Sequence, residues 1–161
     1  MPGSERDVTQ YNERAKIVGV ISFQWSYLEY LVSNVVWHLL GVDKDKGMIV
    51  TGPLDIKPEL GMAMELAEYC SSSDELKAAL KDLSKDLDSQ DGLSSRRNLI
   101  VHGIYSSRPR DPKVMVEAHK SKNRRQRREL TLDYLRETLE KLNARIDRVT
   151  KILESEGINV H

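Results

Sequence analysis

The residues best suited to chemistry lie together in the segment SSRRNLIVHGIYS, residues 94–106. Four of its polar residues recur at steps of three, four and three, and fall on one edge of a helix: Ser95, Asn98, His102 and Tyr105. The long side chain of Arg97 can swing to this edge. A histidine can move a proton near neutral pH and a guanidinium can stabilise charge on phosphate, so this edge could cleave a phosphodiester. The alternative is a histidine that only satisfies a buried hydrogen bond, with an arginine in solvent.

The string Arg97-Asn98-x-x-x-His102 resembles the R-x4-6-H motif of the HEPN superfamily, in which a polar residue commonly follows the arginine. Members are small helical bundles, and many are metal-independent endoribonucleases that act as dimers. The resemblance implies that His102 takes a proton from a ribose 2′-OH, that Arg97 steadies the phosphate, and that Asn98 orients His102 or the phosphate. It also implies an RNA substrate, a 2′,3′-cyclic phosphate product and a composite site in a homodimer. Arg96 meets the looser spacing as well, but Asn98 favours Arg97.

The resemblance suggests a toxin, or a defence or stress effector, with an antitoxin or another protein as partner. HEPN toxins that pair with minimal nucleotidyltransferase antitoxins resemble an R-x4-H-x-Y pattern, which would place a tyrosine at position 104. That position is Ile104, and Tyr105 comes one residue late, which argues against this partnership. One alternative is a non-catalytic HEPN-like module that binds RNA or a protein. Another is a purely structural bundle.

Residues 107–130 carry nine basic and three acidic residues, a net charge of +6, while the rest of the chain carries 16 basic and 22 acidic residues, a net charge of −6. Basic side chains near a phosphodiester site suit binding to the RNA backbone. The alternative is a solvated loop. The predicted RNA-binding residues are Arg96 and Tyr105 beside the motif, and Lys122, Arg124, Arg125, Arg127 and Arg128 in the basic segment.

Residues 8–40 carry the longest apolar pattern of the chain. Steps of three and four predict one helical stripe: Val18, Ile21, Trp25, Leu28, Val32, Val35 and Leu39. A second face carries Phe23, Tyr30 and Trp37, with Val20, Tyr27 and Leu31 between them. Since one face suffices for a bundle core, we expect this aromatic face to meet a second copy of the chain. The alternative is that a short loop or helix covers it.

The remaining pattern predicts three more helical segments. Residues 42–55 read as a connection, and a short helix follows Asp55. Ser72 and Glu75 have the spacing of a capping box and predict the start of the next helix. Its apolar pattern is interrupted at residues 89–92 and resumes through the motif. Alternating apolar residues at 114–118 predict a hairpin or ordered loop, and Thr131 caps a last helix that ends near Gly157. We therefore predict an all-α fold, an antiparallel four-helix bundle with a short basic hairpin or loop before the last helix.

Composition and single-residue counts bear on the number of domains, the cellular compartment and the need for a metal or cofactor. With 161 residues and zero net charge we expect a single domain, residues 1–161, and neither a wholly basic coat nor an acidic tail. The single Cys70 forbids an internal disulfide and favours a reducing compartment. The four histidines lack metal-ligand spacing, and no cofactor motif occurs. Without a membrane-length apolar run or a signal-peptide core, we expect a cytoplasmic protein that needs no metal or cofactor.

Overall fold

The computed structural model describes residues 5–107, 113–121 and 124–160. Within them the chain forms six helices and three strands. The helices are α1 (Glu5–Leu40), α2 (Lys44–Thr51), α3 (Ile56–Tyr69), α4 (Asp74–Asp88), α5 (Leu93–His102) and α6 (Leu132–Ser155). The strands are β1 (Ile104–Ser107), β2 (Val114–Ser121) and β3 (Arg124–Glu129). The predicted helical class is confirmed, with a small antiparallel sheet of order β1-β2-β3 added to it.

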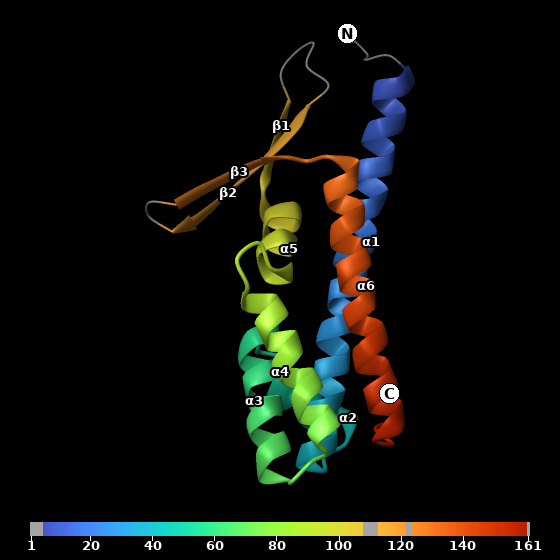
Figure 1. Cartoon of the computed structure of the whole chain (residues 1–161), viewed down its shortest axis with the longest axis vertical. Helices are drawn as coiled ribbons and strands as arrows, with labels where there is room; N and C mark the ends of the chain where they lie inside the picture. Colours follow the sequence, from blue (N-terminus) through green and yellow to red (C-terminus); the bar gives the residue numbers. More distant parts are fainter. Residues whose placement is uncertain (1–4, 108–112, 122–123, 161) are drawn as a thin grey trace.

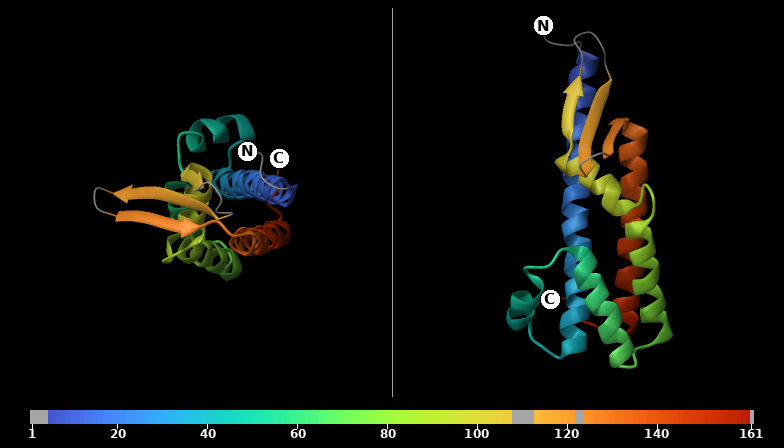
Figure 2. Two further views of the ribbon diagram at one scale, coloured as in Figure 1. Left: turned by 90° about the horizontal axis from the view of Figure 1, so that it is seen from above. Right: turned by 90° about the vertical axis from the view of Figure 1, so that its left-hand side faces the viewer.

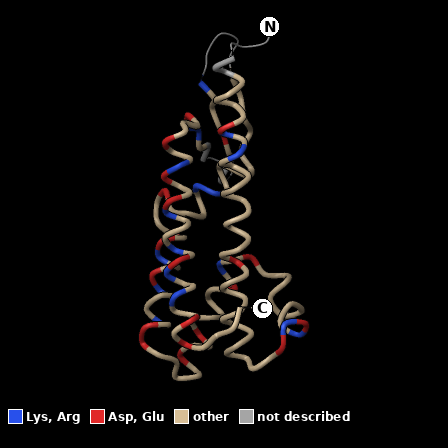
Figure 3. The backbone as a smooth tube through the Cα atoms, turned by 90° about the vertical axis from the view of Figure 1, so that its right-hand side faces the viewer, with Lys and Arg blue, Asp and Glu red and all other residues tan. Residues whose placement is uncertain are grey.

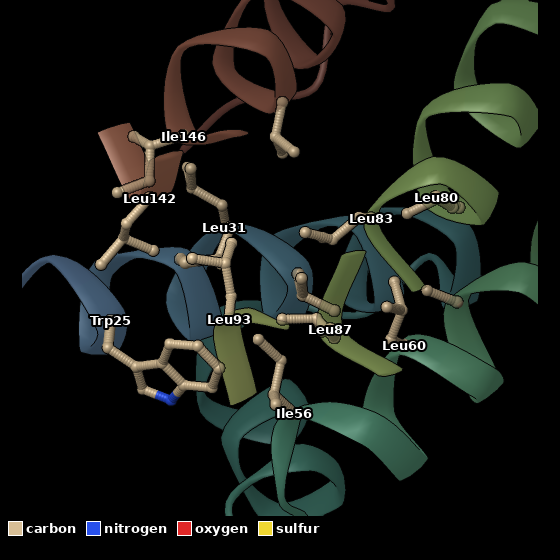
Figure 4. Close-up of a cluster of buried hydrophobic side chains, with 14 of the residues drawn as sticks. Trp25, Leu31, Ile56, Leu60, Leu80, Leu83, Leu87, Leu93, Leu142 and Ile146 are labelled. Carbon is tan, nitrogen blue, oxygen red and sulfur yellow. The ribbon is translucent and has the colours of Figure 1, made fainter. Parts of the chain in front are cut away.

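The two longest helices, α1 and α6, lie side by side, while α3 packs on α1 and α4 packs on α3 and α6 (Figure 1). The short α5 continues the direction of the chain after α4 and contacts α1, α6 and β2. Seen along the helices, the hairpin β2–β3 extends away from the helical body (Figure 2). The core lies between the helices, leucine is its commonest residue, and Trp25 lies at one edge (Figure 4).

The predicted stripe of α1 is buried in its middle, where Ile21, Leu28 and Val32 are fully covered. The helix stops where the sequence predicts, because Gly41 adopts φ +65°, a conformation that glycine enters without steric cost. The middle of α1 carries almost no charge, whereas basic and acidic residues are interspersed along other helices (Figure 3). None of the described helices is long and apolar enough to cross a membrane.

The aromatic face of α1 divides into two parts. Near the end of the helix Trp37 is covered by α2, and its Nε1 donates a hydrogen bond to Thr51 Oγ1 at 3.1 Å. A Cβ atom at Gly47 would lie 2.4 Å from the Trp37 ring, so only glycine permits this approach. The segment 42–55, predicted as a connection, therefore contains a helix. For Trp37 this agrees with the alternative in which a short loop or helix covers the aromatic face. In contrast, Phe23 remains 76% exposed.

The other helix boundaries follow local signals closely. The cap of α4 is Ser73 rather than the predicted Ser72, since Ser73 Oγ accepts a hydrogen bond from Leu76 N at 3.1 Å. Thr131 caps α6 as predicted, with Oγ1 accepting from Tyr134 N at 3.1 Å. Gly157, at φ +67°, follows the end of α6.

The end of α5 departs from the prediction, which continued the helix through Tyr105. The helix ends at His102, and β1 begins at Ile104 and pairs antiparallel with β2. A Cβ atom at Gly103 would lie 2.2 Å from Leu99 O and 2.4 Å from Val116 Cγ2. Close packing of the chain against β2 at Gly103 therefore accompanies the change from helix to strand.

Candidate functional site

Packing orients α5 so that one face remains accessible. Leu93, Leu99 and Ile100 are buried in the core, which fixes the helix against its neighbours. Asn98 and His102 are exposed, and Arg97 is half-buried. The three residues of the predicted motif therefore lie on an accessible side of a well-anchored helix.

The structure brings these three side chains into direct contact. Arg97 Nη1 lies 2.7 Å from His102 Nε2 and 3.1 Å from Asn98 Oδ1. A guanidinium has only donors, so His102 Nε2 accepts this hydrogen bond and the proton of the neutral ring lies on Nδ1. The lone pair that could take a proton from a substrate therefore faces the cation that could bind its phosphate.

Arg97 is also supported from α1. Its guanidinium carbon lies 5.5 Å from the centre of the Trp25 ring, within the range of a cation–π contact. Trp25 is buried, and its Nε1 donates a hydrogen bond to Glu29 Oε1 at 2.8 Å. The tryptophan thus connects the motif arginine to a carboxylate one turn further along α1.

A pocket of about 400 Å³ lies beside the motif, between α1, the start of α3 and α5. Its α5 wall holds Ser94, Arg97, Asn98 and His102. The facing walls are formed by Trp25, Glu29, Asp55, Ile56, Lys57 and Pro58. The predicted edge began at Ser95, but the lining residue in the first turn of α5 is Ser94.

Next to this pocket the first turn of α3 buries a carboxyl group. Glu59 is only 3% exposed and accepts a hydrogen bond from Ser33 Oγ. Burial raises the pKa of Glu59 to about 7; the hydrogen bond from Ser33 opposes this, and the charge of Glu29 adds to it. Glu59 is therefore largely protonated in mildly acidic solution.

Arg96 points to the other side of α5 and is 6% exposed. Its Nη2 lies 2.9 Å from Asp91 Oδ2 and 3.2 Å from Glu137 Oε1, and its Nη1 donates to Thr138 Oγ1 at 3.3 Å. The guanidinium also lies over the Tyr134 ring at 4.8 Å. Arg96 is thus fully engaged in joining α5 to α6, and the structure does not bring it to the motif.

Tyr105 is separated from the motif by the end of the helix. Its hydroxyl donates a hydrogen bond to Ile100 O, and burial raises its pKa. It lines a different, mainly apolar hollow of about 540 Å³, which α1 forms with α5 and the sheet. The predicted helical edge therefore holds for Asn98 and His102 and is wrong for Tyr105.

The basic residues of the hairpin have different environments. Arg127 is exposed. Arg128 lies over the Tyr134 ring at 4.5 Å, and its Nη1 is 3.4 Å from Asp91 Oδ2, so it helps to hold the base of the hairpin. Lys122 and the side chains of Arg124 and Arg125 lie outside the described part of the chain.

Sequence reasoning overlooked Trp25, Glu29 and Ser94 as parts of the site. One signal was present, since Glu29 is the only Asp, Glu, Lys or Arg between Lys16 and Asp43. A lone charge in a long uncharged stretch of helix needs a polar environment, which here is the pocket.

Comparison of the chain with models of known protein families, with curated proteins and with solved structures finds no match. The chemistry of the site itself is therefore what indicates a function.

Proposed function

We propose that the protein is a metal-independent endoribonuclease of the HEPN type. The observation that supports this most strongly is the 2.7 Å contact between Arg97 Nη1 and His102 Nε2, with Asn98 bonded to the same arginine. A general base and a phosphate-binding cation are thereby held together on an accessible surface. We interpret α1, α3, α4 with α5, and α6 as the four helices of a HEPN-like bundle.

The proposed reaction uses only groups of the substrate and the chain. The phosphate of bound RNA attracts Arg97, which releases the Nε2 lone pair of His102. His102 then removes the proton from the ribose 2′-OH, and the 2′-oxygen attacks the adjacent phosphorus. Arg97 stabilises the pentacoordinate phosphate, with Asn98 holding the guanidinium in place. The bond between phosphorus and the 5′-oxygen then breaks, the leaving oxygen takes a proton from water, and the imidazolium of His102 returns its proton to the solvent. The products are a 2′,3′-cyclic phosphate and a 5′-hydroxyl end.

The proposed active form is a homodimer in which the motif faces of two protomers meet. The exposed aromatic part of α1 is not suited to this contact. Phe23 lies two residues from Trp25, so the two side chains are about 160° apart around α1, at about 100° per residue. A dimer formed through Phe23 would therefore leave the two motifs pointing away from each other.

The proposed cellular role is that of a toxin, or of a defence or stress effector, in the cytoplasm, with an antitoxin or other regulatory protein as a further partner. In this role the hairpin would bind the RNA backbone. Arg127 supports this part of the proposal because it is exposed on β3, where a phosphate can reach it.

The test is incubation of the purified protein with labelled single-stranded RNA in EDTA, followed by analysis of the product ends. We expect internal cleavage with 2′,3′-cyclic phosphate ends, and loss of cleavage in His102→Ala. Sedimentation of the same samples should show a dimer at micromolar concentration. Intact RNA, or equal cleavage by both proteins, would contradict the proposal.

One observation favours the alternative of a non-catalytic module that binds RNA or protein. The hydrogen bond from Arg97 occupies the lone pair of His102 Nε2, so without substrate the two groups satisfy each other. In that case His102→Ala should retain RNA or partner binding, and neither protein should cleave.

A further inference from the structure

We propose that the pocket beside the motif is a base-binding subsite that selects guanine, with Glu29 as the residue that reads the base. This inference rests on the proposed function, because it places the guanine on the nucleotide whose 2′-OH is attacked. The pocket has a volume of about 400 Å³, within the range of small-molecule sites, and Arg97, Asn98 and His102 form one wall of it. A base in the pocket would therefore lie directly beside the reacting groups.

The pocket contains polar groups that the protein leaves without a partner. Ser94 is 7% exposed, and its Oγ has no hydrogen-bond partner among the described residues. The same holds for Nε of Arg97. Buried polar groups of folded proteins are nearly always hydrogen-bonded, so two orphaned groups lining one pocket indicate a polar ligand.

Glu29 is held in place for recognition. Trp25 Nε1 donates to Glu29 Oε1 at 2.8 Å, which fixes the carboxylate, and a carboxylate accepts several further hydrogen bonds. Burial raises the pKa of the neighbouring Glu59 to about 7, so in mildly acidic solution that carboxyl group is mostly neutral and adds little charge beside the pocket. The result is an oriented acceptor in the wall of the pocket.

The charges of the pocket favour a base over a phosphate. Two carboxylates, Glu29 and Asp55, line it together with the cations Arg97 and Lys57. Lys57 is already paired with Asp88, which lies outside the pocket lining. A phosphate inside the pocket would meet two carboxylates, whereas the exposed side of His102 and Asn98 leaves room for it next to Arg97.

The identity of the base follows from its hydrogen-bonding edge. Guanine presents two adjacent donors, N1–H and the N2 amino group, which match the two oxygens of a carboxylate. On the corresponding edges of adenine, cytosine and uracil a donor adjoins an acceptor, which a carboxylate would repel. Ile56 and Pro58 supply apolar surface for the ring of the base.

The test measures binding of guanosine, adenosine, cytidine and uridine 3′-monophosphates by calorimetry and NMR. We expect the wild type to bind the guanosine nucleotide at least tenfold more tightly than the others. In Glu29→Gln the amide can still accept from Trp25 and now offers a donor as well, so the preference should shift from guanine toward adenine. Glu65→Gln, at an exposed position of α3, is the matched control and should bind as the wild type does.

Equal binding of the four nucleotides, or an unchanged preference in Glu29→Gln, would overturn the subsite. These outcomes are independent of cleavage. If the wild type selects the guanosine nucleotide but leaves RNA intact, the subsite stands and the endoribonuclease proposal fails. If RNA is cleaved with the same base preference by wild type and Glu29→Gln, the endoribonuclease stands and the subsite is wrong.

Discussion

Arg96 and Arg97 are neighbours in the sequence, but their side chains leave α5 in directions about 100° apart and contact different parts of the protein. Arg96 is buried, and its guanidinium contacts Asp91, Glu137 and Thr138. Arg97 is half-buried, contacts His102 and Asn98, and keeps an Nε without a partner among the described residues. The first arginine is fully used in joining parts of the protein, whereas the second retains capacity for a ligand.

The difference follows from what each face of α5 meets. On the Arg96 side Asp91 adopts φ +58°, an unusual conformation for a residue other than glycine, although aspartate tolerates it better than most. Its backbone oxygen and its carboxylate both accept hydrogen bonds from Arg96. On the Arg97 side the neighbours leave a pocket. Residue type alone therefore does not distinguish a structural arginine from one available to substrate.

The largest effect that we predict is on the Arg97 side. Arg97→Ala and His102→Ala should each lower the single-turnover rate of RNA cleavage by about 10³-fold, since each removes a group that acts only on the reacting atoms. Their melting temperatures should remain close to that of the wild type. Arg148→Ala, which removes an exposed arginine of α6, is the control and should cleave normally. If Arg97→Ala kept the wild-type rate, Arg97 would not be the arginine that acts on the substrate.

The opposite result is expected on the Arg96 side. Arg96→Met should lower the free energy of unfolding by about 3 kcal/mol, because it leaves Asp91 and Glu137 without their common partner. Urea unfolding measures this change. Arg96→Lys should recover only part of the loss, since lysine cannot reproduce the forked contacts of the guanidinium. A loss below about 1 kcal/mol would mean that Arg96 is not the anchor of α5.

A slightly smaller effect is expected from Glu59, the carboxyl group next to the Arg97 side. Its pKa is about 7 in the folded protein, above the value of 4.5 for an unperturbed carboxyl group, so the folded state keeps the proton up to a higher pH than the unfolded state does. The free energy of unfolding should therefore decrease by about 2–3 kcal/mol as the pH rises from about 4.5 to 7, and then level off.

Glu59→Gln should remove this pH dependence while it still accepts the hydrogen bond from Ser33. The measurement is urea unfolding at several pH values for wild type and variant, with the exposed Glu65→Gln as control. Identical pH profiles in wild type and Glu59→Gln would refute the assignment of the shift to Glu59.

The smallest effect concerns the hairpin. Arg127→Ala should weaken RNA binding a few-fold and lower the slope of log affinity against log salt concentration by about 0.7, the value for one phosphate of a single strand. Filter binding at several salt concentrations measures both quantities, again with Arg148→Ala as control. An unchanged slope would mean that Arg127 does not contact the RNA backbone.

Much of the helical structure is predictable, because the long helices carry unbroken steps of three and four apolar residues. The helix α2 is not, since its sequence has the glycine and polar residues of a turn. It packs over Trp37 of α1, which lies 14 residues before Thr51, and this contact between two helices is specified by the tertiary structure.

The same distinction applies to the site. Arg97, Asn98 and His102 are close in sequence, and helical spacing was enough to bring them together. At the end of α5 Gly103 packs closely against Val116 of β2, and no local sequence pattern predicts this contact. Trp25 and Glu29 reach the pocket from α1 through packing. The proximity of the three motif residues could therefore be predicted from the sequence, whereas the residues around them could be found only from the structure.

The most direct measurement of the central claim compares cleavage of two oligonucleotides of identical sequence in EDTA, one of RNA and one fully 2′-O-methylated. If Arg97 and His102 activate the ribose 2′-OH without a metal ion, the wild type should cleave the RNA to 2′,3′-cyclic phosphate ends and leave the methylated strand intact. Cleavage of both strands, or of neither, would contradict the account.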